Sequence, residues 1–220
     1  MSSNALPLGY PQVNPRYVRE FRYLCEVYTG GNVAMEKDKS ILKMPGVLDF
    51  VQVAAVYCAL VEPATTSVWD RDTVEHCRRL LADIYARGIA LPNLAMDPYA
   101  VLERQVREED YEAIQNRLER IFGEHDRFLN AQMEEMKYSD RPVSVSMAEV
   151  LADIYQALAD FVWIMRGAHE QSMYQAVAEV RFTMMERWGT LLLAALRQLH
   201  DLLNDPDFEL AEDGGGDDWM

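Results

Sequence analysis

Apolar residues recur every three or four positions along most of this chain, which is the spacing of one face of an α-helix. The pattern is longest near the C-terminal end, where the predicted core face of one helix consists of Met173, Val177, Val180, Met184, Trp188, Leu191, Ala195, Leu199 and Leu202. Gly189 falls inside this stretch, and a glycine in a helix costs about 1 kcal/mol relative to alanine. We therefore expect a bend or a close helix contact at Gly189.

Five further segments carry helix signals. Val47–Glu62 is apolar nearly all round, which predicts a helix in the middle of a bundle. Asp72-Thr-Val-Glu75 and Ser146-Met-Ala-Glu149 have the pattern of capping boxes, so each predicts a helix start. Asp97-Pro98 predicts the start of another helical stretch, and the charged segment Glu108–Phe122 ends before a glycine.

The pentapeptide Leu-Ala-Asp-Ile-Tyr occurs twice, at Leu81–Tyr85 and at Leu151–Tyr155. The similarity between the two regions does not extend past the pentapeptide, so it does not indicate a duplicated domain. It indicates two helices that use the same residues to pack against the core.

Strand signals are weak, because β-branched residues do not alternate with polar ones for long. Val143–Ser146 is the one weak candidate. Six or more helices and no sheet predict an all-α fold, a multi-helix bundle of mostly antiparallel helices with a long C-terminal helix.

Three regions are expected along the chain. Residues 1–40 form an N-terminal extension: Asn14-Pro15 resembles a helix start, and a linker follows the predicted helix, whose apolar face is Tyr17, Val18, Phe21, Leu24, Cys25 and Tyr28. Residues 41–205 form the helical bundle domain. Residues 206–220 are rich in acids and contain three consecutive glycines, which predicts an acidic disordered tail. Met35 is an alternative start, although the well-capped N-terminal helix favours the longer chain.

Composition narrows the class of protein. The formal net charge is −15, which disfavours nucleic acid as a direct ligand because phosphates would be repelled. Neither a secretory signal nor a membrane span is expected. Cys25, Cys58 and Cys77 have no close spacing and fall on apolar helix faces, so free, reduced thiols are expected. A cytoplasmic protein fits these observations.

Several motifs together resemble a bacterial family, domain-of-unknown-function family 5063, over roughly residues 41–205. The segments that carry the resemblance are Asp49–Glu62, Met136–Pro142, Ser146–Glu149, Leu151–Gln156, Ala159–Val162, Glu186–Gly189 and Ala194–His200. The resemblance implies a helical fold and no assigned chemistry. One departure is that Gln156–Asp160 lacks a charged pair that the family tends to carry, which weakens any role that depends on this helix's polar face.

One acidic stripe is a candidate site. Glu149, Asp153 and Asp160 share a helix face, and no base stands at neighbouring positions to pair with them. With Glu62 or Glu179 they suggest a site for Mg²⁺ or Mn²⁺, or for a basic partner. The alternative is structural: Glu149 caps the helix, Asp160 is solvated, and Asp153 accepts a bond from Arg181, Arg187 or Tyr138.

Two further segments are candidates for binding. Tyr138 and Asp140 lie in a turn between helices, where either a structural turn or a ligand-contacting loop is consistent with the residues. Asp217, Asp218 and Trp219 end the tail as acids followed by an aromatic residue, which fits a docking peptide as well as a solubilising tail.

The sequence thus favours a non-catalytic protein-binding or adaptor module without a cofactor, acting on a protein partner with a basic surface. The first alternative is a divalent-metal hydrolase of phosphate-bearing small molecules, with Glu62, Asp153, Asp160 and Glu179 as ligands. The second is a structural homodimer, in which the apolar face of the last helix pairs across a two-fold axis.

Overall fold

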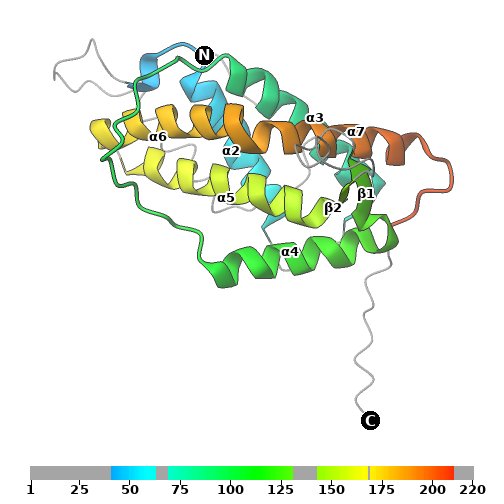
Figure 1. The fold of residues 1–220 in the computed structure, drawn as a ribbon. Helices are drawn as coiled ribbons and strands as arrows, with labels where there is room; N and C mark the ends of the chain where they lie inside the picture. Colours follow the sequence, from blue (N-terminus) through cyan, green and yellow to red (C-terminus); the bar gives the residue numbers. More distant parts are fainter. Residues whose placement is uncertain (1–40, 63–68, 131–142, 168, 211–220) are drawn as a thin grey trace, which may run out of the picture.

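The computed structural model describes residues 41–62, 69–130, 143–167 and 169–210, and these form a helical bundle (Figure 1). The family-like all-α fold predicted from the sequence is confirmed. The predicted helix at residues 15–28 and Cys25 lie outside the described residues. Within the described residues, no helix is both long and apolar enough to cross a membrane.

Helix α2 (Val47–Val61) is the central element, as its apolar sequence predicts. It follows a short 3-10 turn, η1 (Ile41–Lys43), and packs against α3 (Arg71–Ile89) and α5 (Met147–Arg166). The buried Tyr57 hydroxyl donates to the backbone oxygen of Leu151 at 2.8 Å, which ties α2 to the start of α5. The two copies of the repeated pentapeptide lie on α3 and α5, and their leucine and isoleucine residues are fully buried.

The start of α3 differs from the prediction. Its N-cap is Asp70, whose carboxylate accepts from the Thr73 backbone N–H at 2.8 Å and from the Thr73 hydroxyl at 2.5 Å. These bonds lower the pKa of Asp70. The Asp72–Glu75 pattern therefore starts two residues after the N-cap, inside the helix, and Glu75 instead pairs with Arg78 and Arg79.

Residues 90–107, here named the strap, connect α3 to α4 (Glu108–Phe122) without a helix. The helix predicted from Asp97-Pro98 is wrong, because these residues form only a turn. Side chains of the bundle hold the strap instead: Gln175 accepts from the Asp97 backbone N–H at 2.8 Å, and Arg181 donates to the Leu91 oxygen at 2.9 Å. In Figure 1 the strap runs along one edge of the bundle toward α4.

A small hairpin was not predicted. After a 3-10 turn, η2 (Gly123–Asp126), strand β1 (Arg127–Asn130) pairs antiparallel with β2 (Val143–Ser146), with Phe128 opposite Val145. The weak strand signal at Val143–Ser146 was correct, whereas β1 carried no signal because its four residues, Arg-Phe-Leu-Asn, include no β-branched side chain.

The hairpin positions the start of α5. Ser146 is the N-cap predicted from the sequence, and its hydroxyl accepts from the Glu149 backbone N–H at 3.1 Å. The buried Asp126 accepts from the Ser146 hydroxyl at 3.1 Å and from the Ala148 backbone N–H at 2.8 Å. A carboxylate at a helix start is favourable because the N-terminal N–H groups carry partial positive charge.

The long C-terminal helix is one continuous run with a π-helical turn inside it. Helix α6 (Glu170–Thr183) leads into the π turn (Met184–Trp188, labelled η4), and α7 (Gly189–Asn204) follows. The extra residue of the π turn shifts the inward face, so Leu192 is buried and Leu191 is only half-buried. The other residues of the predicted apolar face are buried within this chain.

The close contact expected at Gly189 is present. A Cβ atom at Gly189 would lie 2.4 Å from the backbone oxygen of Met184. Gly88 of α3 approaches the same methionine from the other side, since a Cβ atom there would lie 2.3 Å from the Met184 sulfur.

Residues 206–210, which the sequence assigned to the acidic tail, pack against the bundle. Phe208 is buried, and its ring meets the His125 ring edge-on with centroids 5.0 Å apart. Arg71 donates to the Phe208 oxygen at 3.1 Å and to the Leu203 oxygen at 2.5 Å, which caps the end of α7. Residues 206–210 thus belong to the bundle.

Candidate functional site

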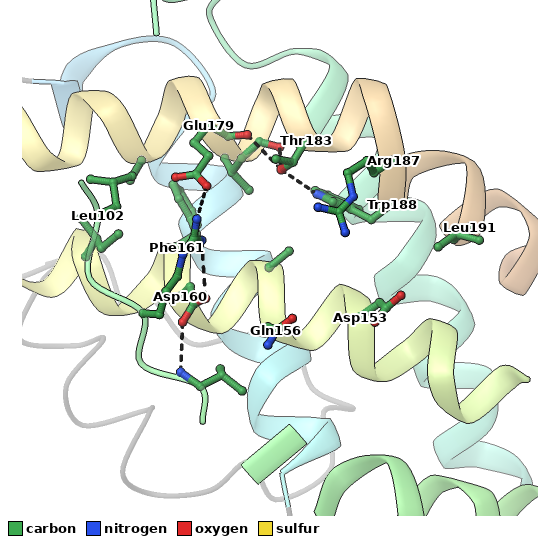
Figure 2. A pocket seen from close by; sticks show the side chains of 16 residues that line it. Leu102, Asp153, Gln156, Asp160, Phe161, Glu179, Thr183, Arg187, Trp188 and Leu191 are labelled. Atoms are coloured by element: carbon green, nitrogen blue, oxygen red, sulfur yellow. Dashed lines mark hydrogen bonds and ion pairs between the residues drawn. The ribbon is translucent and has the colours of Figure 1, made fainter. Parts of the chain in front are cut away.

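A cavity of about 310 Å³ lies between α5, the α6–α7 helix and the strap, and is here named the inner cavity (Figure 2). Volumes of this order are found in small-ligand and peptide-contact sites. It is lined by Leu102, Arg104, Val106, Asp153, Gln156, Ala157, Asp160, Phe161, Ile164, Ala176, Glu179, Val180, Thr183, Arg187, Trp188 and Leu191.

Asp160 fastens the strap to α5. It is 3% exposed, so the expectation that it is solvated is wrong. Its Oδ1 accepts from the backbone N–H groups of Gln105 and Val106 at 2.7 and 3.0 Å. Each of these N–H groups would otherwise lack a partner in the bundle. The carboxylate is therefore a structural acceptor for a segment without regular secondary structure.

Arg104 stands between the two carboxylates that face each other across the inner cavity. Its guanidinium lies 3.6 Å from Oδ2 of Asp160 and donates to Oε1 of Glu179 on α6. The hydrogen bond to Glu179 raises the pKa of Arg104. Figure 2 shows this chain of contacts from Glu179 to Asp160 and on to the strap backbone. The positive charge that a cation would supply at this place is already provided by an arginine.

Asp153 has a partner that the sequence did not indicate. The Tyr111 hydroxyl of α4 donates to its Oδ1 at 2.8 Å. Within the part of the chain that the structure describes, the predicted partners Arg181 and Arg187 form neither a hydrogen bond nor an ion pair with it. Burial, followed by this hydrogen bond, raises the pKa of Tyr111. The hydroxyl thus stays protonated as the donor, and Asp153 is one of the residues that line the inner cavity.

The π turn supplies the remaining polar wall. Thr183 accepts from the Trp188 indole N–H at 3.1 Å and donates to the Glu179 backbone oxygen at 2.9 Å. Arg187 is exposed and forms no ion pair with the residues that the structure describes. Figure 2 shows it extending from the turn toward α5 over Gln156. π-helical turns of this kind are frequent at functional sites.

A second cavity of about 540 Å³ adjoins the first and is here named the outer cavity. Leu102 and Ile164 line both cavities, so the two form one continuous depression along α5, named the groove from here on. The outer cavity is lined by Val101, Leu102, Glu103, Trp163, Ile164, Arg166, Gly167, His169 and Ser172. Trp163 is 42% exposed and Val101 is 94% exposed, so this end of the groove offers apolar surface to water.

The four ligands of the alternative metal site are not gathered at one point. Asp153, Asp160 and Glu179 line the inner cavity, whereas Glu62 accepts from the Tyr155 hydroxyl at 2.9 Å and does not line it. Among the described residues, no group of three or more His, Cys, Asp or Glu side chains is arranged to hold a metal ion. The partners of Asp160 are N–H donors of the strap and Arg104, which gives this carboxylate a structural role different from the solvated one expected.

Five candidate residues lie outside the described residues, namely Tyr138, Asp140, Asp217, Asp218 and Trp219. Arg104 and Tyr111 were not predicted as site residues, and the sequence carries no signal for them. Arg187 was expected only as a possible partner of Asp153 and Trp188 only as part of an apolar helix face, although both belong to the Glu186–Gly189 segment that resembles the family. Cys58 and Cys77 are buried free thiols, as expected.

Comparison with known proteins matches the family model described as a domain of unknown function (DUF5063) to residues 44–205. Among solved structures, protein BF1032 from Bacteroides fragilis is similar, with 29% sequence identity and a TM-score of 0.65. That similarity covers 77% of this chain and 99% of the Bacteroides chain. No curated protein matches the chain.

Proposed function

The chain belongs to the DUF5063 family, and we propose that it is a non-catalytic protein-binding module whose groove takes a basic, partly apolar segment of a partner protein. The single observation that supports this proposal is that the carboxylates lining the groove are already engaged in hydrogen bonds and ion pairs within the chain. Asp160 is bonded to two backbone N–H groups and to Arg104, Glu179 to Arg104, and Asp153 to Tyr111. Carboxylates held in this way are poor general bases and poor metal ligands, because accepting a proton or a metal would cost existing bonds.

The surface of the groove supports recognition of a peptide segment. Its outer end exposes apolar area at Trp163 and Val101, and its inner end carries Trp188, Leu191 and polar side chains. Aromatic residues beside polar groups are typical of contact sites for proteins.

Electrostatics favour a basic partner. The chain has 36 Asp and Glu against 21 Lys and Arg. Exposed acids follow one another at the start of α4, at Glu108, Glu109, Asp110 and Glu112, and Glu103 lines the outer cavity. A surface of this sign accelerates association with a positively charged partner and weakens with added salt. We also propose a cytoplasmic location, which the reduced state of the buried Cys58 and Cys77 supports.

Site-specific photo-crosslinking tests this function. A benzophenone amino acid replaces Gln156, which is exposed and lines the inner cavity, in cells that make the protein. The matched control carries the same group at Ala82, an exposed position in the middle of α3 that lines neither cavity. We expect a protein adduct from position 156 that is absent from position 82, with a basic segment of the partner at the crosslink. Equal adducts from both positions, or none from position 156, would contradict the proposed function.

A further inference from the structure

We propose that the inner cavity also binds a small zwitterion, an α-amino acid with an apolar side chain, whose carboxylate pairs with Arg187 and whose ammonium group pairs with Asp153. This inference goes beyond the proposed function, because it assigns a free small molecule to one part of the groove. An occupied inner cavity is closed to a partner segment, so the amino acid competes with the partner for the same residues.

The first argument is the balance of charge in the inner cavity. Three carboxylates and two guanidinium groups line it. Arg104 lies between Asp160 and Glu179 and is paired with both, and Asp160 also accepts from two backbone N–H groups of the strap. These three side chains are engaged with one another. Arg187 and Asp153 are therefore the charged groups of the cavity that remain for a ligand.

The second argument is that Arg187 needs an acceptor. It forms no ion pair with the residues that the structure describes, although a planar guanidinium carries five N–H donors and pairs best with a carboxylate or a phosphate. The side chain extends from the π turn toward α5, over Gln156 (Figure 2). A carboxylate of a ligand in the inner cavity would supply the acceptor.

The third argument is that Asp153 can accept a further donor and keep the one it has. It is half-buried, and the Tyr111 hydroxyl donates to its Oδ1 at 2.8 Å. An ionised carboxylate has about four acceptor positions, so an ammonium group can be added beside the hydroxyl. Asp153 precedes Gln156 by three residues on α5, which makes the two neighbours on one helix face. Arg187 and Asp153 thus border the same part of the cavity with opposite charges.

Opposite charges side by side select the net charge of the ligand. A simple carboxylate would be attracted by Arg187 and repelled by Asp153, and a simple amine would meet the reverse. A zwitterion forms both ion pairs and adds no net charge to a lining that already has one more carboxylate than guanidinium groups. The adjoining outer cavity has Glu103, Arg166 and His169, so its one acid and one arginine add no preference for either sign.

The size and the apolar lining of the inner cavity fit an apolar side chain. An engineered cavity of about 150 Å³ in another protein holds a benzene molecule, so about 310 Å³ has room for an aromatic ring with its amino and carboxylate groups. Leu102, Ala157, Ile164 and Leu191 line the cavity and are only half-buried. Covering their exposed apolar area would stabilise the bound state. An amino acid such as L-phenylalanine satisfies both the charged and the apolar part of the lining.

Isothermal titration calorimetry of the full-length protein with L-phenylalanine and L-leucine tests the proposal. Three blocked forms are the controls: N-acetylphenylalanine keeps only the carboxylate, phenylalaninamide keeps only the ammonium group, and N-acetylphenylalaninamide keeps neither. We expect each blocked form to bind at least about tenfold more weakly than L-phenylalanine, because each loses at least one charge-assisted hydrogen bond. The comparison uses the unaltered protein, so it does not depend on the folding of a variant. No binding of either amino acid, or equal binding of N-acetylphenylalaninamide, would overturn the proposal.

Two variants assign the binding to the two charged side chains. Arg187→Gln and Asp153→Asn each remove one charge, and each should weaken the binding of L-phenylalanine at least about tenfold. Arg197→Gln is the matched control, since this exposed arginine of α7 lines neither cavity and should leave the affinity unchanged. An affinity that stays the same in Arg187→Gln or in Asp153→Asn would also overturn the proposal.

The failure of this inference is distinguishable from the failure of the proposed function. A partner adduct at position 156 together with no binding of the amino acids would overturn this inference and leave the proposed function standing. Binding of L-phenylalanine that both variants weaken, without a partner adduct, would support this inference and contradict the proposed function.

Discussion

Asp160 of α5 accepts a hydrogen bond from the backbone N–H of Val106, 54 positions earlier in the chain, at 3.0 Å. A second bond, from Gln105 at 2.7 Å, ends on the same carboxylate oxygen. Together they fix the strap over the inner cavity and make one acidic side chain the anchor of a groove wall. The wall that the strap forms therefore depends on Asp160.

Replacing Asp160 with alanine should loosen this wall. The backbone N–H groups of Gln105 and Val106 lose their acceptor, so we expect the free energy of unfolding to fall by about 2 kcal/mol. Urea denaturation measures this, and trypsin should cut faster after Arg104 and Arg107. The control is Asp83→Ala, at an exposed position of the first pentapeptide, which should change neither. An Asp160→Ala protein as stable and as protease-resistant as the parent would disprove the anchoring role.

Replacing Tyr111 with phenylalanine should remove its hydrogen bond to Asp153 and leave the packing of the ring unchanged. The ring still packs, but Asp153 loses its donor, and we expect a loss of about 1 kcal/mol in the free energy of unfolding. The double variant with Asp153→Asn measures the coupling, because the two losses should not add for residues in contact. Additive losses would mean that the 2.8 Å contact between the hydroxyl and the carboxylate contributes nothing.

Stability should fall at alkaline pH. Burial raises the pKa of Cys77 from 9.0 to about 12 and raises that of Cys58 as well. In the unfolded chain these thiols ionise near pH 9, so above that pH the folded state binds more protons and becomes less favoured. The stabilising contribution is complete below pH 9 and is lost as the pH rises toward about 12.

Urea midpoints between pH 8 and 11 measure this loss. Each buried thiol contributes a slope of up to about 1.4 kcal/mol per pH unit. Cys77→Ala should therefore reduce the slope by about one thiol's share, whereas Ala82→Cys, an exposed thiol, should leave it unchanged. A slope that is insensitive to Cys77→Ala would show that ionisation of this thiol does not limit alkaline stability.

Alanine at Gly189 should destabilise the protein although it favours helices. Helix propensity alone predicts a gain of about 1 kcal/mol. The new Cβ atom would lie 2.4 Å from the Met184 oxygen, so the π turn must shift, and overpacking of this kind costs about 1–3 kcal/mol. Thermal melting should show a lower midpoint for Gly189→Ala and a nearly unchanged one for Thr190→Ala at the neighbouring exposed position. A higher midpoint for Gly189→Ala would contradict the structure at the π turn.

The segment after α7 should contribute to stability. Phe208→Ala removes the ring that contacts His125 and lies 5.8 Å from the Arg71 guanidinium. Burial of a phenylalanine side chain stabilises by about 2 kcal/mol, and we expect a loss of this order in urea denaturation. Glu209→Ala, at the exposed neighbouring residue, serves as control. Equal stability of the two variants would mean that residues 206–210 do not contribute to the stability of the bundle.

The features that the sequence predicted correctly are those with a local pattern. The apolar run of α2, the Ser146 cap of α5 and the apolar face of the last helix all depend on residues close together in the chain. Even there, one position of the buried face was predicted wrongly, because the π turn makes Leu192 the buried residue in place of Leu191. A single inserted residue leaves no signature in the spacing of apolar residues.

The site residues were only partly predictable, for the opposite reason. Asp153 and Asp160 stood out as acids without nearby bases, but their partners, Tyr111 and Arg104, lie 42 and 56 positions away. A bond from a side chain to a distant backbone N–H, such as that of Asp160, leaves no mark in the sequence. A helix was wrongly predicted from Asp97-Pro98 within the strap for the same reason. The side chains that hold the strap in its non-helical conformation belong to other elements, distant in the sequence.

The central claim is that the groove carboxylates are held for structure and binding, and not for a metal. Thermal melting of the full-length protein in millimolar Mg²⁺ or Mn²⁺, compared with melting in a chelator, tests it most directly. A metal that binds only the folded state raises the midpoint, by an amount equivalent to about 2.7 kcal/mol at one hundred times its dissociation constant. We predict the same midpoint in all three conditions. A rise with Mg²⁺ or Mn²⁺ that Asp153→Asn abolishes would contradict the claim.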